Sequence, residues 1–361
     1  MIQLLEKLIA FQTTSDNQTE VKRGFEFIAS VFDEKKFDVR YFEKNGVYSL
    51  LVSFKGADYL KPNILLNGHF DVVPAEDEKQ FEMRIEDGRA YGRGTIDMKG
   101  MVAVLVEVMR ELGKKTNPPN VALLLNGDEE MGGANGAGFI AGEIGLKPEY
   151  VLCADGPSEE KLRLTIKEKG GVWVELKARG KTAHGAYPWK GENAIEKLWD
   201  AIGKIKAFVG AMEADAWKGT VNVSIVETSN KTANKVPADA RAVLDIRFTE
   251  ALARTPEELV EKLRGIAPEI EMNALAMVAL MFSEENHPFL QQFKKTAQDV
   301  ARYEVELVYE HGATDARYFA AQGSTCIVFG AIGGNYHAEG EWVDLKSLEQ
   351  NKEILLKFLR D

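Results

Sequence analysis

Cysteine and histidine are scarce in this sequence, and it has no long hydrophobic run. Among 361 residues there are two cysteines and five histidines. Cys153 and Cys326 lie in apolar segments, so we expect reduced core thiols of a cytoplasmic protein rather than a disulfide framework. The longest apolar stretch, around residues 274–282, is far too short to span a membrane. The first residues, MIQLLEKLIAF, are interrupted by Glu6 and Lys7 and do not resemble a secretion signal.

Positive charge is also in short supply. The 45 Lys and Arg residues are outnumbered by 56 Asp and Glu residues, which gives a net charge of −11. There is no basic run, so the composition argues against a nucleic-acid partner and against binding to an anionic membrane. The hydrophobic fraction of 45% is that of an ordinary globular protein. A chain of this length forms about two domains and folds without a metal staple, so a bound metal would serve chemistry.

Apolar strand-like runs alternate with helical periodicity in the first and last parts of the chain. We expect strands at residues 48–54, 63–67, 121–126, 150–154 and 325–329, and helices at 20–32, 98–112, 288–301, 315–321 and 345–359. Several of the strands are almost continuously apolar, which is typical of strands covered on both faces. The pattern predicts an α/β domain with a central mixed sheet flanked by helices.

The middle of the chain has a different pattern. Strands at residues 170–179, 221–228 and 241–248 alternate between apolar and polar side chains, and helices are expected at 193–207 and 256–265. This order predicts an inserted α+β sandwich with an antiparallel sheet under two helices. We therefore expect a discontinuous larger domain at residues 1–165 and 284–361, and an inserted domain at 166–283.

Acidic and histidine side chains gather where predicted strands end, and such ends are where α/β proteins build their sites. His69 and Asp71 follow one strand with a spacing of two, so Asp71 can accept the ring proton of His69 and orient it. A histidine held for packing alone is the alternative. Asp97 begins a long amphipathic helix, where an N-cap is the simpler interpretation.

Three further segments follow the same rule. Glu129 and Glu130 stand with Asp128 after a buried strand and before two glycines, a pattern that also fits a solvated acidic loop. Asp155 precedes Gly-Pro, which alone predicts a turn, and His337 lies in a glycine-rich loop.

Together these side chains favour a metal site. Two imidazoles with several carboxylates suit zinc, cobalt or manganese better than magnesium or calcium, and two divalent ions would offset most of five clustered carboxylates. A phosphate-binding loop at GDEEMGGANGAG is the competing hypothesis. That segment lacks the Gly-x-Gly-x-x-Gly and Gly-Lys-Ser/Thr patterns, and its acids would repel phosphate.

The segments GHFDVVP, YGRGTIDMKG, DEEMGG and ADGPS, with the late His337, resemble the two-zinc amidohydrolase and exopeptidase family. Acetylornithine deacetylase, succinyl-diaminopimelate desuccinylase, aminoacylase and glutamate carboxypeptidase belong to that family. The resemblance covers essentially the whole chain. It implies two divalent ions per subunit, zinc first and cobalt or manganese as alternatives, and an inserted domain that acts as lid and dimer interface. The implied metal ligands are His69, Asp97, Glu130, Asp155 and His337.

The resemblance also implies roles for individual side chains. Asp97 would bridge both ions and precede a cis peptide, Glu129 would be the general base, and Asp71 would hold His69. His184, in RGKTAHGAYPWKGENAI, would reach the active site of the neighbouring subunit, although a simple turn histidine fits the same segment. Substrate contacts would come from the segments NKVPADARAVLDIRF and EHGATDARYF, with the residues Asn234, Arg247, Gly312, Thr314 and, next to them, Arg317. Arg247 equally fits an exposed strand position.

The expected activity is hydrolysis of an amide bond in a small N-acyl amino acid by a metal-activated water with a glutamate base. A deacylase similar to acetylornithine deacetylase or succinyl-diaminopimelate desuccinylase is the first hypothesis. A di- or tripeptidase or a carboxypeptidase of the same family is the alternative. At the position that matches Asp155, the family pattern has Asp in acetylornithine deacetylase and in di- and tripeptidases, whereas Glu is usual in the desuccinylases, aminoacylases and carboxypeptidases. A catalytically silent binding subunit is a more remote alternative, since no implied ligand or base is missing. The expected partners are the substrate and a second copy of the chain.

Overall fold

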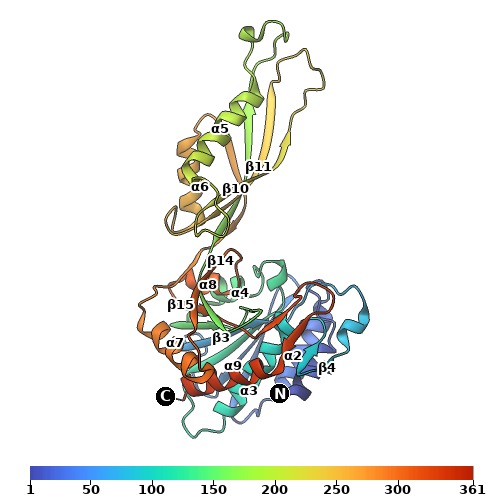
Figure 1. The fold of residues 1–361 in the computed structure, drawn as a ribbon, viewed down its shortest axis with the longest axis vertical. Coiled ribbons are helices and arrows are strands. Elements are labelled where there is room, and N and C mark those ends of the chain that lie inside the picture. Colours follow the sequence, from blue (N-terminus) through green and yellow to red (C-terminus); the bar gives the residue numbers. More distant parts are fainter. Residues whose placement is uncertain (361) are drawn as a thin grey trace. The chain divides into compact units, whose positions relative to one another are not determined.

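The computed structural model describes residues 1–360, in which strands and helices alternate along most of the chain (Figure 1). Two compact units are present. The first contains Met1–Lys167, Phe282–Tyr309 and the segment from Thr314 onward, and the second contains Glu168–Met281 and Glu310–Ala313. The sequence pattern placed the boundaries at 165/166 and 283/284, whereas residues 310–313 group with the second unit in the structure.

A large mixed sheet, most of which belongs to the first unit, has the strand order β1-β2-β6-β3-β7-β15-β8-β13, and β14 pairs with β8. Strands β6, β3, β7 and β15 run parallel to one another, while β1, β2 and β8 join antiparallel. The strands are β1 (Phe37–Lys44), β2 (Val47–Phe54), β3 (Ile64–His69), β6 (Val121–Asn126), β7 (Tyr150–Cys153), β8 (Arg163–Glu168), β13 (Met281–Phe282), β14 (Glu306–Glu310) and β15 (Thr325–Val328). The expected α/β class with a central mixed sheet is confirmed.

Helices flank this sheet, with α3 and α9 toward one face and α4 and α8 toward the other (Figure 1). The helices of the first unit are α1 (Ile2–Ile9), α2 (Gln18–Ser30), α3 (Gly100–Leu112), α4 (Ala137–Phe139), α7 (Pro288–Ala301), α8 (Ala316–Ala320) and α9 (Leu345–Phe358). Short helical turns lie at Glu78–Phe81, Thr95–Lys99, Glu129–Met131 and Ile140–Ile144.

The core of the first unit explains the continuous apolar runs in its sequence. All six residues of β6 are buried, and so are residues 101–106 of α3, which packs against β3, β6 and α9. A strand covered on both faces favours apolar side chains at most of its positions, and each fully buried aliphatic side chain contributes about 1.5–3 kcal/mol. The parallel strands are therefore a rigid support for the loops at their ends. Cys153 and Cys326 are both buried in this unit.

A second, smaller sheet ties two distant segments of the first unit together. Its antiparallel order is β16-β17-β5-β4. The strands are β4 (Arg84–Glu86), β5 (Arg89–Tyr91), β16 (Gly333–Gly334) and β17 (Trp342–Asp344). The pairing of β17 with β5 brings the loop between β16 and β17 to the loop that follows β5.

The second unit contains an antiparallel sheet of order β10-β11-β9-β12, with α5 and α6 packed against its strands (Figure 1). The elements are β9 (Gly170–Arg179), a helical turn at Pro188–Lys190, α5 (Ala194–Val209), β10 (Thr220–Glu227), β11 (Asp239–Phe248), α6 (Pro256–Ile266) and β12 (Glu271–Val278). Asn193 caps α5 by accepting from the backbone of Ile195, and Thr255 caps α6 by accepting from Glu258. No helix among residues 1–360 is both long and apolar enough to cross a membrane.

Candidate active site

Four of the expected site residues lie at the carboxyl ends of parallel strands. His69 is the last residue of β3, Glu129 and Glu130 follow β6, and Asp155 follows β7. Because β3 lies between β6 and β7, the three strand ends are adjacent. Loops at such ends converge while the sheet holds them in place. The local order of strand and loop thus brings together side chains that are far apart in the sequence.

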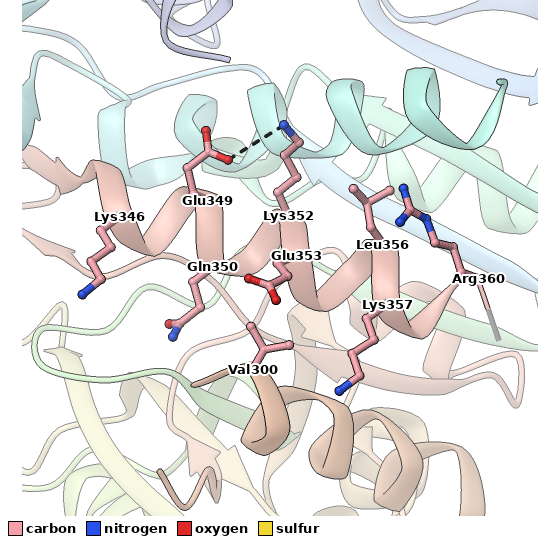
Figure 2. A pocket seen from close by; sticks show the side chains of 9 residues that line it. All are labelled: Val300, Lys346, Glu349, Gln350, Lys352, Glu353, Leu356, Lys357 and Arg360. Atoms are coloured by element: carbon pink, nitrogen blue, oxygen red, sulfur yellow. Dashed lines mark ion pairs between the residues drawn. The ribbon is translucent and has the colours of Figure 1, made fainter. Parts of the chain in front are cut away.

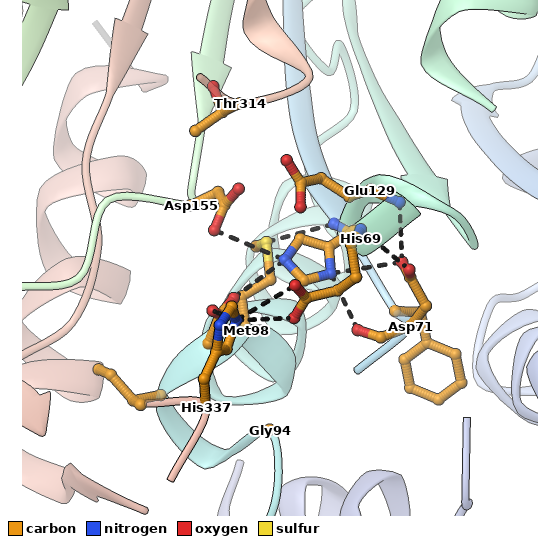
Figure 3. A network of polar contacts seen from close by, with 12 residues as sticks. His69, Asp71, Gly94, Met98, Glu129, Asp155, Thr314 and His337 are labelled. Atoms are coloured by element: carbon orange, nitrogen blue, oxygen red, sulfur yellow. Dashed lines mark hydrogen bonds and ion pairs between the residues drawn. The ribbon is translucent and has the colours of Figure 1, made fainter. Parts of the chain in front are cut away.

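His69 lies at the centre of the cluster and is fully buried (Figure 3). Its Nδ1 lies 2.9 Å from the backbone carbonyl of Asp71 and 3.4 Å from the Asp71 carboxylate. Its Nε2 faces Asp97 Oδ1 at 3.0 Å and Asp155 Oδ1 at 3.5 Å. Burial opposes a charge on the ring, but the carboxylates of Asp155, Asp71 and Asp97 raise its pKa well above the usual value. The nitrogen that faces away from Asp71 is therefore the one available to a cation.

Asp71 does more than hold the histidine ring. Its carboxylate accepts hydrogen bonds from the backbone N–H groups of Glu129, at 3.2 Å, and of Glu130, at 3.1 Å. It also accepts from the Ser15 hydroxyl at 2.7 Å. One buried carboxylate thus fixes the two strand ends relative to each other. The sequence pattern indicated the contact with His69, but nothing local in it indicates Ser15.

The two carboxylate oxygens of Asp97 point to different histidines. Oδ1 lies 3.0 Å from His69 Nε2, and Oδ2 lies 3.1 Å from His337 Nε2. His337 Nε2 is also 3.1 Å from Glu130 Oε2. Burial opposes the charge on Asp97, but hydrogen bonds from both rings lower its pKa. The peptide bond between Asp97 and Met98 is cis, as the resemblance implied.

Glu129 and Asp155 complete the cluster. Ligand atoms of His69, Glu129 and Asp155 all lie within 4.8 Å of one another, and so do those of His69, Asp97 and Glu130. Burial raises the pKa of Glu129 well above its ordinary value, and repulsion from Asp155 adds to this. Burial also raises the pKa of Asp155 to about 6, although His69 opposes it. Carboxylates that resist ionisation when gathered in this way fit a site that is completed by divalent cations.

The loop after β6 is shaped by glycine and by an arginine clamp. Gly133 has φ +66°, and a Cβ there would lie 2.1 Å from Asp315 Oδ1, so a larger residue does not fit. Arg317, which is 5% exposed, donates from Nη2 to the carbonyl of Gly132 at 2.6 Å and from Nη1 to that of Thr314 at 2.7 Å. The guanidinium therefore holds the loop that carries the two glutamates against the segment 314–317.

Thr314 lies beside Asp155 in Figure 3, and its hydroxyl is 3.9 Å from Cys153 Sγ. Gly312 is exposed and has open space around its Cα, and it groups with the second unit. The structure thus places Thr314 next to the end of β7, which Asp155 follows, and its role in substrate binding stays a prediction. The role expected for Gly312 stays a prediction.

The other expected residues belong to the second unit. His184 and Asn234 are both exposed and lie on adjacent segments, since His184 forms a β-bridge with Lys235 and the Gly185 N–H donates to the Asn234 carbonyl at 2.6 Å. Arg247 forms a bidentate ion pair with Asp245, in which Nε donates to Oδ1 at 2.8 Å and Nη2 donates to Oδ2 at 3.1 Å. The structure brings the first two together, and their roles, like that of Arg247, stay predictions.

A groove of about 660 Å³ runs along α9, and it is not this site (Figure 2). Lysine and glutamate side chains form most of its walls, and Lys352 pairs with Glu349 at 3.8 Å. The lining residues are Val300, Lys346, Glu349, Gln350, Lys352, Glu353, Leu356, Lys357 and Arg360. The groove contains no histidine and none of the expected site residues.

The fold and the site, together with the family that the sequence matches, define a metal-dependent hydrolase. The chain belongs to peptidase family M20/M25/M40, whose family model matches residues 65–361. Succinyl-diaminopimelate desuccinylase of Acidiphilium cryptum is 29% identical over 351 residues, which is 92% of this chain and 91% of that protein. The enzyme of the same name from Sulfurovum is 26% identical over 372 residues, or 100% of this chain and 98% of that protein.

Two solved structures show the same fold. An aminopeptidase from Bacillus cereus has a TM-score of 0.73 and 20% identity, with 99% of this chain and 96% of that chain covered. A metallo-carboxypeptidase from Sulfolobus solfataricus has a TM-score of 0.71 and 19% identity, with 99% and 98% covered. The mixed sheet with a separate antiparallel sheet is therefore the architecture of this family.

Proposed function

We propose that the protein is a deacylase that hydrolyses the amide bond of a small N-acyl amino acid, as acetylornithine deacetylase and succinyl-diaminopimelate desuccinylase do. The observation that carries the proposal is the position of Asp97 between His69 and His337, with Glu129 beside them. The relatives named succinyl-diaminopimelate desuccinylase, which match nearly the whole chain, support a deacylase over other activities of the family.

The donor set supports two divalent ions, with zinc as the first choice and cobalt or manganese as alternatives. His69 and Asp155 would hold one ion, Glu130 and His337 the other, and Asp97 would bind both. The two oxygens of Asp97 face separate histidines, which is the arrangement that a shared carboxylate ligand requires. Such ions would supply the Lewis acidity that polarises an amide carbonyl and acidifies a water molecule.

Glu129 is the general base of the proposed reaction. Burial and the nearby Asp155 raise its pKa, so its carboxylate is a stronger base than an exposed glutamate. It removes a proton from the attacking water and passes it to the leaving amine. Asp71 holds Glu129 through the backbone and keeps the His69 ring in place.

Residues of the second unit contribute to substrate binding in this proposal. The partner subunit's His184 donates to the oxyanion, a contribution of about 3 kcal/mol for one such donor. Asn234 and Arg247, with Gly312 and Thr314, contact the substrate, and closure of the inserted domain excludes water. The neighbouring positions of His184 and Asn234 support a shared role.

The proposed assembly is a homodimer formed through the inserted domain, which acts as lid and dimer interface. Large apolar side chains are exposed on that domain, including Trp199 on α5 at 49% and Val226 on β10 at 45%. Strand β10 lies at one end of its sheet, so one of its sides is open to a second copy. Buried thiols at Cys153 and Cys326 support a reducing, cytoplasmic location.

A small peptidase is the second candidate. Asp155 occupies the position where the family pattern has Asp in deacetylases and in di- and tripeptidases. A tripeptidase from Staphylococcus aureus has a similar fold, with a TM-score of 0.72 and 17% identity over nearly the whole of both chains. A carboxypeptidase activity is a third possibility, and a silent binding subunit is disfavoured because the base and all five proposed ligands are present.

Glu129→Gln tests the proposal. Zinc- or cobalt-loaded protein is assayed on N-acetylornithine, N-succinyl-diaminopimelate, other N-acetyl amino acids and dipeptides. We expect turnover of an N-acyl amino acid by the unmodified protein. The variant should lose at least about 100-fold in kcat, because the base is gone, while its metal content is unchanged.

Glu159→Gln, at an exposed acid of the same unit, is the matched control and should behave like the unmodified protein. If dipeptides are cleaved faster than N-acyl amino acids, the peptidase hypothesis replaces the deacylase hypothesis. Substantial activity in Glu129→Gln would exclude Glu129 as the base.

A further inference from the structure

Glu341 is a buried carboxylate next to the site whose function is not explained by the proposed reaction. It is 3% exposed and follows His337 by four residues. Its oxygens accept four hydrogen bonds from one short segment. Oε2 accepts from Arg93 Nη1 at 2.7 Å and from the Gly94 N–H at 2.8 Å. Oε1 accepts from the N–H groups of Ile96, at 3.0 Å, and of Asp97, at 3.3 Å.

This carboxylate is not required to join the two chain segments. Strand β17 already pairs with β5 through Trp342 and Tyr91, and the Gly92 N–H donates to the Glu341 carbonyl at 3.1 Å. The Glu341 side chain acts beyond the end of that pairing, on the loop that turns toward Asp97. Arg93 is itself only 2% exposed, so the ion pair balances charge within the protein.

The geometry therefore connects two proposed metal ligands through one residue. The backbone N–H of Asp97 donates a hydrogen bond to the Glu341 carboxylate. Glu341 also belongs to the loop that carries His337. Partners that orient metal ligands in this way commonly change metal affinity or activity by about 10- to 100-fold when they are altered.

We propose that Glu341 is a positioning residue that sets the place of Asp97 relative to His337 and thereby the affinity for the metal pair. This inference rests on the proposed roles of Asp97 and His337 as metal ligands. Glu341 touches neither substrate nor reacting atoms. Its effect passes through the Asp97 loop.

Glu341→Asp is the variant that separates positioning from charge. It retains the negative charge beside Arg93, but its side chain is one methylene shorter and cannot reach both pairs of donors. Metal-free protein is titrated with cobalt, and binding is followed by calorimetry and by the visible absorption of the bound ion. We expect cobalt affinity to fall about 10- to 100-fold and the absorption bands to shift. In the cobalt-saturated enzyme, kcat should fall more than KM rises.

Glu339→Asp is the matched control, since Glu339 is exposed and two residues away in the same loop. It should leave cobalt binding, absorption and activity unchanged. Glu341→Gln keeps the length of the side chain but removes its charge and replaces one acceptor oxygen with an NH2 group. It should also weaken cobalt binding, because one pair of donors loses its acceptor. The melting temperature of each variant is measured in parallel.

A merely structural role would lower the melting temperature of Glu341→Asp and leave its cobalt affinity and spectrum as they were. That result would overturn the inference while the metal site stands. If the unmodified protein takes up no cobalt, the proposed metal site itself fails.

Discussion

At the scale of single residues, the surroundings of His69 and His337 raise the pKa of both rings and so favour their protonated, charged form when no cation is bound. Hydrogen bonds to Asp97 and Glu130 raise the pKa of His337 to about 10. Carboxylates likewise raise the pKa of buried His69. His337 is therefore positively charged near pH 7 in the metal-free chain, and the neighbouring carboxylates favour the charged form of His69 as well. A metal ion and these protons compete for the same nitrogens.

We therefore predict that metal uptake releases protons. Because a higher pH removes the competing proton, zinc affinity should rise as the pH increases from about 6 to 9. Calorimetric titration in buffers of different ionisation enthalpy measures the number of protons released. His337→Gln should release about one proton fewer.

His311→Gln is the control, since His311 is exposed and has no place in the cluster. Its proton release should equal that of the unmodified protein. Uptake of zinc with no proton release at pH 7 would contradict the protonated state of His337.

Some contacts of the site could be read from the sequence and others could not. The spacing of His69 and Asp71 after an apolar strand indicated that the two interact, because alternate residues of a strand share a face. The pairings of Asp71 with Ser15 and of Asp97 with Glu341 depend on how distant loops meet. No local pattern in the sequence encodes such a contact, so Ser15 and Glu341 were not predicted.

At the scale of elements, α3 forms the support behind the Asp97 loop. Leu105 of α3 is fully buried, and a Cβ at Gly68 would lie 3.7 Å from its Cδ1. Gly68 immediately precedes His69. The packing of this helix therefore reaches the backbone that carries a proposed ligand.

Leu105→Ala should lower the free energy of unfolding by about 2–5 kcal/mol, because it removes buried methyl groups and leaves a cavity. Urea unfolding of the metal-free protein measures the loss. Arg110→Ala, on the exposed side of the same helix, should change it by no more than about 0.5 kcal/mol. Equal effects of the two changes would contradict the structural role of this face of α3.

Elements were predicted best where both faces are buried. The strands that became β6 and β7 and the helix α3 have apolar runs that only a covered position tolerates. Strand β1 was not predicted, because FDVRYFEK carries four charged residues and lies at the edge of the sheet, where polar side chains meet water. Helix α1 was also not predicted, since its eight residues are short for a periodicity argument.

At the scale of the whole molecule, the change of pattern in the middle of the chain predicted an inserted domain. It could not predict that residues 310–313, far along the chain, group with that domain. Four residues carry too little periodicity to be assigned, and their grouping arises from tertiary contacts.

In the proposed dimer, each site takes His184 from the other subunit. Two inactive variants should therefore restore activity when they form a mixed dimer. Glu129→Gln and His184→Ala protein should each have little activity. When the two are unfolded and refolded together, half of the dimers are mixed, and each mixed dimer has one complete site. Activity should therefore return to about a quarter of that of the unmodified protein. The measurement is kcat before and after mixing, with dimer formation followed by light scattering.

Asp71→Asn mixed with Glu129→Gln is the control, because both changes affect the same proposed half of the site and no complete site can form. Activity that does not return in the first mixture would show that His184 does not act across subunits. A monomer in solution would rule out the arrangement as well.

The proposed ligands begin at His69, and the last of them, His337, comes after every strand of the large sheet. During synthesis on the ribosome, the early strand ends emerge with their carboxylates long before the second histidine of the site exists. A complete set of the proposed ligands therefore exists only late in the synthesis of the chain.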